Sequence, residues 1–101
     1  MPHDVKQGAQ HTLQWQLGTD VSAASEVRLR AATEPSVTPV IDRAITVDGT
    51  DGTLVYTTIT AAETGTVQNL LVEIIATWPN GDVVKFPPIG YELLRIREDL
   101  T

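Results

Sequence analysis

The chain has 101 residues, a length that suits a single domain whose hydrophobic core needs no metal or disulfide for support. It contains no cysteine, which excludes disulfide frameworks, thiol catalysis and thiolate metal sites. Its formal net charge of −6 argues against nucleic acids and anionic membranes as partners, because both attract clustered Lys and Arg side chains.

The first nine residues are polar, and Val5 is their aliphatic anchor. We expect residues 1–9 to form an extended N-terminal arm or a weak first strand. The chain starts without the basic residues and the apolar run of a signal peptide, so we expect no export signal.

Two segments in the N-terminal third alternate between apolar and polar side chains, which is typical of half-buried strands. The side chains expected to face the core are Leu13, Trp15 and Leu17 in residues 12–17, and Val27, Leu29 and Ala31 in residues 26–31. The polar side chains between them are expected to face solvent.

Turn-forming residues divide the middle of the chain into further short strands. The segment 34–39 contains two prolines and is expected to be the least ordered internal loop. Residues 40–47 form one strand or two short ones, and the glycine-containing turn 48–52 leads into a returning strand at 53–59.

The chain is organised around a hairpin near its C-terminus. Residues 70–78 are a nearly continuous apolar run, which is typical of a strand covered on both faces. Asn80-Gly81 supplies a tight turn, residues 83–86 return as a second strand, and the two prolines that follow interrupt the hydrogen-bond ladder. The apolar run is too short to span a bilayer.

Two local patterns predict departures from regular strands. Thr60 and Glu63 have the spacing of a capping box, which predicts one helical turn. In the last strand, residues 91–97, the apolar set changes from odd to even positions, which predicts a bulge near Leu93.

These segments together predict about seven short strands with turns between them. That spacing is typical of an all-β fold, an immunoglobulin-like antiparallel β-sandwich. We expect residues 1–101 to form one such domain.

Several motifs follow one another in a distinctive order. They are Asp20-Val21-Ser22-Ala23-Ala24, Val27-Arg28-Leu29-Arg30, Gly52-Thr53-Leu54-Val55-Tyr56, Glu73-Ile74-Ile75-Ala76-Thr77-Trp78-Pro79-Asn80-Gly81, Phe86-Pro87-Pro88-Ile89-Gly90-Tyr91 and Ile96-Arg97-Glu98-Asp99-Leu100. In these motifs the chain resembles, from about Leu13 onward, the small immunoglobulin-like modules of tailed-bacteriophage virions. That class includes the N-terminal domain of siphophage baseplate upper proteins.

The most specific part of this resemblance is the Trp-Pro-Asn-Gly turn followed by Phe-Pro-x-x-Gly-Tyr. The chain departs from such modules at Gln68-Asn69-Leu70, where they often carry Gly-x-Tyr, and at Ala23-Ala24, where they usually have more glycine. The resemblance implies a structural part of a virion, made in the bacterial host cytoplasm, whose partners are other virion structural proteins in a symmetric multi-copy assembly.

The sequence carries no Gly-x-Ser-x-Gly motif and no phosphate-cradling glycine loop, so we expect no enzyme and no cofactor. His3 and His11 lie too far apart in an extended segment to share a metal ion. The turn 48–52 does not continue as a calcium loop, because Ile59 stands where such a loop has a bidentate Glu. Glu73 interrupts the apolar run, so it needs either an exposed face or a partner, most simply an outward arginine of a neighbouring strand.

Four arginines form the candidate docking surface. Arg28 and Arg30 lie two residues apart, as do Arg95 and Arg97, so each pair projects from one face of its strand. Such pairs form either a solvated face that pairs with acids or a charged surface that docks onto neighbouring subunits. We favour docking, because four of the seven basic residues occur in these two pairs.

The sequence thus predicts a non-enzymatic structural protein of a tailed-phage virion that docks onto oligomeric capsid, neck or tail proteins. The alternative is a carbohydrate-binding, adhesin-like module that contacts the host surface through a stacking platform of Trp78 and Tyr91. Core or turn packing is the more common role for such aromatic residues. A third alternative is an assembly chaperone that is absent from the finished particle.

Overall fold

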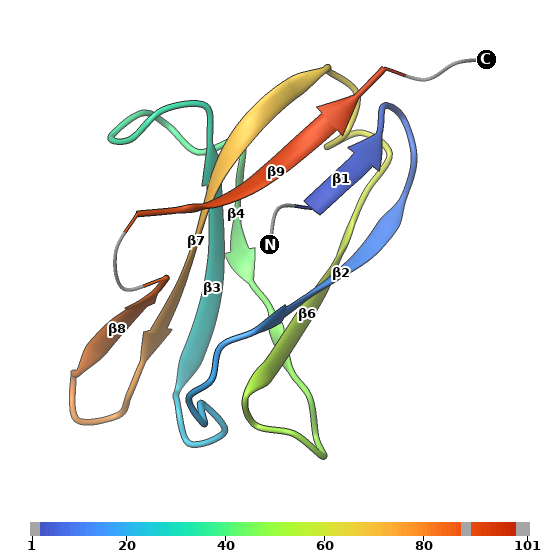
Figure 1. Cartoon of the computed structure of the whole chain (residues 1–101). Coiled ribbons are helices and arrows are strands. Elements are labelled where there is room, and N and C mark those ends of the chain that lie inside the picture. The colour runs from blue at the N-terminus through green and yellow to red at the C-terminus, as the bar shows by residue number, and fades with distance from the viewer. Residues whose placement is uncertain (1–2, 88–89, 99–101) are drawn as a thin grey trace.

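The structure is a computed structural model that describes residues 3–87 and 90–98 (Figure 1). Every regular element in these residues is a strand. In chain order the strands are β1 (His3–Lys6), β2 (His11–Gln16), β3 (Glu26–Ala32), β4 (Ile41–Ala44), β5 (Thr46–Val47), β6 (Leu54–Ile59), β7 (Gln68–Thr77), β8 (Val83–Phe86) and β9 (Glu92–Arg97). No helix long and apolar enough to cross a membrane occurs within the described ranges.

The strands form two sheets that face each other. Sheet A has the order β1-β9-β7-β3-β4, with β8 also paired to β7, and sheet B has the order β2-β6-β5. The order β9-β7-β3-β4 facing β2-β6-β5 matches strands G-F-C-C′ facing B-E-D in a variable-type immunoglobulin sandwich. The predicted immunoglobulin-like β-sandwich is therefore confirmed.

The number of strands also agrees with the prediction once continuous segments are counted together. The chain passes from β4 in sheet A to β5 in sheet B across the single residue Ile45, whose amide donates to the carbonyl of Val27 at 2.8 Å. Strands β8 and β9 pair with successive halves of β7 and so act as one interrupted strand. With each of these two pairs counted as one, the nine described strands reduce to seven.

The hydrophobic core lies between the two sheets. Trp15 is only 6% exposed, and the predicted inward residues of residues 26–31 are buried around it. The buried apolar side chains are Val5, Leu13, Trp15, Val21, Val27, Leu29, Ala31, Ile41, Val55, Ile59, Leu70, Val72, Ile74, Ala76, Phe86, Leu94 and Ile96. They come from eight of the nine strands and the loop after β2, so period-two alternation builds one continuous core.

The N-terminal segment belongs to the sandwich in its described part. β1 pairs in parallel with β9, and Val5 is buried at 2% exposure. The Gln7 amide then donates to the Arg97 carbonyl at 2.7 Å, and the Gly8 amide donates to the Thr64 carbonyl at 3.0 Å. Residues 3–8 are therefore a first strand and its exit rather than an extended arm, and the first two residues of the predicted arm lie outside the described residues.

The central hairpin forms as predicted. β7 and β8 are antiparallel, the Trp78 amide donates to the Asp82 carbonyl at 2.9 Å, and Gly81 has a φ of 94° in the turn. The expectation that β7 is covered on both faces is wrong. Its even-numbered residues from Leu70 to Ala76 are buried, whereas its odd-numbered residues from Leu71 to Thr77 are only half-buried. The reason is that sheet B covers one face of sheet A alone.

The predicted bulge near Leu93 is absent. β9 pairs with β7 in regular register from Gln68↔Ile96 to Val72↔Glu92. Leu94 and Ile96 are buried, so Leu93 projects from the opposite face, which we call the outer face of sheet A. Leu93 stands there opposite Leu71. The prediction of a bulge assumes that Leu93 faces the core, whereas it pairs with another apolar residue on the outer face.

The turn between β5 and β6 is built from carboxylates that accept hydrogen bonds from their own backbone. Asp48 Oδ1 accepts from the Thr50 amide at 2.8 Å, and Asp51 Oδ1 accepts from the Thr53 hydroxyl at 2.5 Å and from the Thr53 amide at 3.0 Å. These bonds stabilise the ionised carboxylates and lower the pKa of both Asp48 and Asp51. The segment is thus a plain turn, and no group of three metal-ligating side chains occurs in the described part of the chain.

We predict that Gly52→Ala destabilises the fold. A Cβ at this position would meet the carboxylate of Asp20 and lie 3.1 Å from Cβ of Ser22. Overpacking of this kind costs about 1–3 kcal/mol, measurable by urea denaturation. Gly49→Ala in the same turn is the matched control, because nothing lies within 4 Å of its Cβ. Equal stability of the two variants would contradict the prediction.

Candidate functional site

The four predicted docking arginines all lie on the outer face of sheet A. Each one alternates with buried neighbours on its strand. β3 carries Arg28 and Arg30, β9 carries Arg95 and Arg97, and β7 runs between them. The structure therefore places the two pairs on one face but separates them by a strand.

Both arginine pairs have acidic partners. Arg28 Nη1 lies 2.7 Å from Asp42 Oδ1, and Arg30 Nε lies 3.6 Å from Asp42 Oδ2. Arg28 Nε also contacts Glu26 Oε1 at 3.1 Å. The hydrogen bond from Arg28 lowers the pKa of Asp42, so this carboxylate stays ionised beside its partners.

The second pair shares one aspartate from the first strand. Arg95 binds Asp4 with two hydrogen bonds, Nε to Oδ1 at 2.6 Å and Nη2 to Oδ2 at 2.9 Å. Arg97 Nε lies 3.7 Å from the same Oδ1. The bond from Arg95 lowers the pKa of Asp4. Acid pairing, one of the two alternatives for these arginines, is thus present, and their use in docking stays a prediction.

Glu73 lies half-buried on the outer face of sheet A rather than beside a partner. It projects from the outer face of β7 and stands opposite Arg30 in the register of β3 and β7. Arg30 nevertheless turns to Asp42, and no hydrogen bond or ion pair joins Glu73 to another described residue. The predicted ion pair with a neighbouring arginine does not form, because Asp42 on the far side of β3 competes for it.

The histidines do not approach one another as metal ligands. The His3 ring packs on Trp15, with ring centroids 5.0 Å apart, and its Nε2 lies 2.9 Å from the Gln14 carbonyl oxygen. His11 begins β2 opposite Ile59. The structure therefore uses His3 to cover the edge of the core.

Trp78 and Tyr91 do not form a common stacking platform. Trp78 packs against the core cluster at the end of β7. Tyr91 is 46% exposed and lies beside the outer face of sheet A. Since the two rings are on opposite sides of the sheet, the specific arrangement suggested for a carbohydrate-binding module is not formed.

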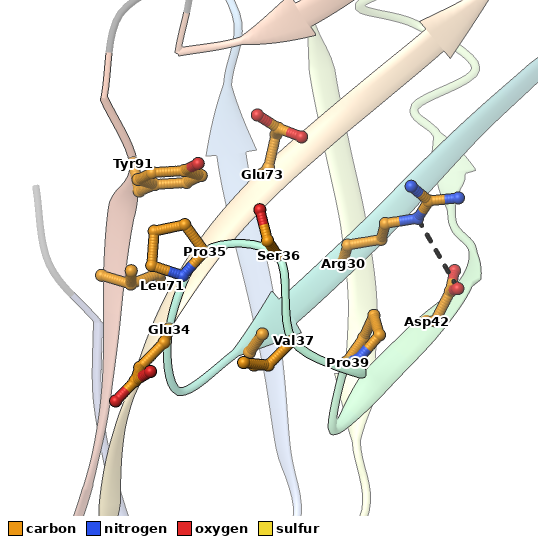
Figure 2. A pocket seen from close by; sticks show the side chains of 11 residues that line it. Arg30, Glu34, Pro35, Ser36, Val37, Pro39, Asp42, Leu71, Glu73 and Tyr91 are labelled. Atoms are coloured by element: carbon orange, nitrogen blue, oxygen red, sulfur yellow. Dashed lines mark ion pairs between the residues drawn. The ribbon is translucent and has the colours of Figure 1, made fainter.

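A hollow lies where the loop between β3 and β4 crosses the outer face of sheet A (Figure 2). Its volume is about 440 Å³. The residues that line it are Arg30, Ala32, Glu34, Pro35, Ser36, Val37, Pro39, Asp42, Leu71, Glu73 and Tyr91. The proline-containing loop, which the sequence marks only as poorly ordered, is thus one wall of a pocket.

The edge strand β8 is a second accessible feature. It pairs with β7 alone, so its other edge is unpaired within the described residues. Val83 and Val84 on this strand are 54% and 41% exposed. Figure 1 shows β8 at the margin of sheet A, away from sheet B. Exposed apolar edges of this kind are templates for pairing with another chain.

The part-buried ion pair between Arg43 and Glu63 is not predicted by any pattern in the sequence. Arg43 on β4 binds both oxygens of Glu63, at 2.9 Å and 2.7 Å, and donates from Nη2 to the Thr58 carbonyl at 2.6 Å. Glu63 also accepts from the Thr60 amide at 2.9 Å, as the predicted capping box requires. Only the contact between Thr60 and Glu63 has a local sequence pattern, the capping box, whereas Arg43 lies 20 residues away from Glu63.

No protein-family model matches the sequence, and a search of curated proteins finds no match. The function proposed below therefore depends on the fold, on its accessible surfaces and on the resemblance in the sequence motifs.

We predict that the Arg43–Glu63 pair makes the fold sensitive to acid. Burial opposes ionisation of Glu63, but the Thr60 amide and the Arg43 guanidinium outweigh it and lower the pKa of Glu63 below its ordinary value of 4.5. The stabilisation is therefore complete above pH 4.5 and is lost as the pH falls through the lower folded value.

Glu63→Gln tests this, because glutamine keeps the capping hydrogen bond and removes the charge. We expect the variant to lose about 1–3 kcal/mol at pH 7 and to approach the stability of the original chain below pH 4. Urea denaturation at a series of pH values measures both. A stability difference that does not change with pH would contradict the assignment.

Proposed function

We propose that this chain is a non-enzymatic, immunoglobulin-like structural module of a tailed-phage virion that docks onto oligomeric capsid, neck or tail proteins. The observation that carries the proposal is the free edge of β8 with its two exposed valines. Docking needs a surface that can be covered by a partner, and an unpaired strand edge offers both backbone hydrogen bonds and apolar side chains.

The placement of the resembling motifs supports this proposal. The Trp-Pro-Asn-Gly segment forms the turn between β7 and β8, and Phe86 ends β8. The most specific motifs of the resemblance to virion modules therefore lie in or directly after the hairpin that presents the free edge. Weak contacts at such an edge are multiplied when many copies bind a symmetric assembly.

β8 and β9 lie on the same side of β7 but differ in what lies beyond them. β1 pairs in parallel with the outer edge of β9, and Val5 of β1 is buried. β8 has no second neighbour beyond β7 in the described residues. A partner strand added to the free edge of β8 would widen sheet A there, as β1 does beside β9.

The first test is the presence of this protein in purified particles of the phage that encodes it. We expect mass spectrometry to find it at a fixed number of copies per particle. Its absence from finished particles, with abundant protein in the infected cell, would contradict the proposal and favour an assembly chaperone.

We predict that the double variant Val83→Lys, Val84→Lys is not incorporated into particles. Two charged side chains on the edge hinder addition of a partner strand. We expect incorporation to fall about tenfold or more, which corresponds to roughly 1.4 kcal/mol. Immunoblots of purified particles measure this, after complementation of a phage that lacks the gene.

The matched control is Val67→Lys, Val40→Lys, which adds the same charge at two exposed valines outside β8. Both double variants should keep the unfolding midpoint within the range of ordinary surface substitutions, about 0.5 kcal/mol. Equal incorporation of the two double variants would show that the β8 edge is not the docking surface.

A further inference from the structure

The pocket on the outer face of sheet A has a floor, an aromatic wall and an excess of negative charge. Its floor is formed by Leu71 and Glu73 of β7 and by Arg30 of β3, and the loop 34–39 crosses in front of them (Figure 2). Tyr91, which precedes β9, closes one side. The pocket therefore combines residues from three strands and the loop that follows one of them.

The charges that line this pocket do not balance. The lining contains one guanidinium, that of Arg30, and three carboxylates, those of Glu34, Asp42 and Glu73. Arg30 is paired with Asp42 at 3.6 Å, and Asp42 also binds Arg28 at 2.7 Å. Glu73 has no hydrogen bond or ion pair with another described residue, so its carboxylate is available to a cationic group. An anionic ligand would be repelled by this excess.

The apolar part of the lining fits an aliphatic chain. Leu71, Pro35 and Val37 line the hollow beside Tyr91. The Tyr91 ring is 46% exposed and is therefore accessible to a ligand. Figure 2 shows Tyr91 next to Pro35, with Glu73 projecting on the same side of the loop as the Tyr91 ring. A side chain with an apolar stem and a positively charged end therefore matches the apolar lining and the Glu73 carboxylate beside it.

We propose that the pocket binds a lysine or arginine side chain presented by a partner protein. The aliphatic stem of the basic residue lies along Leu71 and Pro35. Its charged end binds the Glu73 carboxylate and faces the Tyr91 ring, where a cation is attracted by the π-electrons. Arg30 of the floor is held by Asp42 and leaves Glu73 to the ligand.

This recognition of a basic side chain goes beyond the docking proposed for β8 and does not depend on it. The pocket uses the outer face of β7 and the loop after β3, whereas β8 offers its backbone edge. The β8 double variant described above should bind basic peptides as well as the original chain does. A failure of either proposal can therefore be told from a failure of the other.

The test is a titration of the full chain, labelled with nitrogen-15, with four blocked tripeptides followed by NMR. The probes are acetyl-Gly-Arg-Gly-amide, acetyl-Gly-Lys-Gly-amide and their Gln and Glu counterparts. We expect the Arg and Lys peptides to shift the amide signals of residues 34, 36, 37, 73 and 91 with a dissociation constant of about 1–10 mM. The Gln and Glu peptides should leave these signals unchanged.

Two variants decide whether Glu73 is responsible. Glu73→Gln should weaken binding of the Arg peptide about threefold or more, the size of effect that one accessible ion pair has. Glu98→Gln removes the same charge from an exposed residue outside the pocket and should leave binding unchanged. Tyr91→Leu should also weaken binding, since it removes the aromatic face.

The proposal is overturned if the Gln peptide shifts the same signals as strongly as the Arg peptide, or if Glu73→Gln binds as well as the original chain. Shifts of these signals by the neutral disaccharides lactose or maltose that persist in Glu73→Gln, without shifts by the basic peptides, would likewise overturn it and favour a carbohydrate site. Loss of binding in 500 mM NaCl relative to 50 mM NaCl is expected, because salt screens accessible charges.

Discussion

The guanidinium of Arg43 joins the two sheets at the margin where the chain crosses from one to the other. β4 belongs to sheet A, whereas Thr58 lies in β6 of sheet B and Glu63 lies in the turn that follows β6. The crossover has only Ile45 between β4 and β5, and Ile45 packs against the hydrophobic core. The guanidinium divides its donors between the two partners, Nη1 to the Glu63 carboxylate and Nη2 to the Thr58 carbonyl, and such directed bonds supply geometric specificity that apolar contact lacks. The contact thus ties β4 of sheet A to β6 of sheet B and to the turn that follows it.

The two faces of sheet A divide the roles of the chain. The inner face is apolar and carries the stability, because Leu29, Val72 and Leu94 are all buried against sheet B. The outer face holds charged side chains. Some of them form ion pairs with one another, and Glu73 does not. Asp42 on the edge strand β4 forms ion pairs with both Arg28 and Arg30 of β3. Because Arg30 pairs with Asp42, the carboxylate of Glu73 remains available to a ligand. A surface function can therefore arise from a pattern of charges without any deep cleft.

Much of the fold follows from local sequence patterns. Alternation around Trp15, the Asn80-Gly81 turn and the Thr60–Glu63 capping box are each properties of a few neighbouring residues, and the structure contains all three. The errors have a common cause, since they concern residues whose neighbours are far away in the chain. The outward position of Leu93 depends on Leu71, and the partners of Arg95 and Arg43 are 91 and 20 residues distant. No local period encodes such pairs, and so the pocket and the acid partners of the arginines could not be predicted.

The parallel pairing of β1 with β9 has a mechanical consequence. The first and the last strand of the sandwich are direct neighbours and run the same way, from His3↔Leu94 to Lys6↔Arg97. Tension applied between the two ends of the domain would pull these strands in opposite directions along their length. The interstrand hydrogen bonds would then be loaded in shear and share the force, rather than open one after another as in a zipper. The same chain geometry that seals this edge therefore suits a module that must keep its shape under traction.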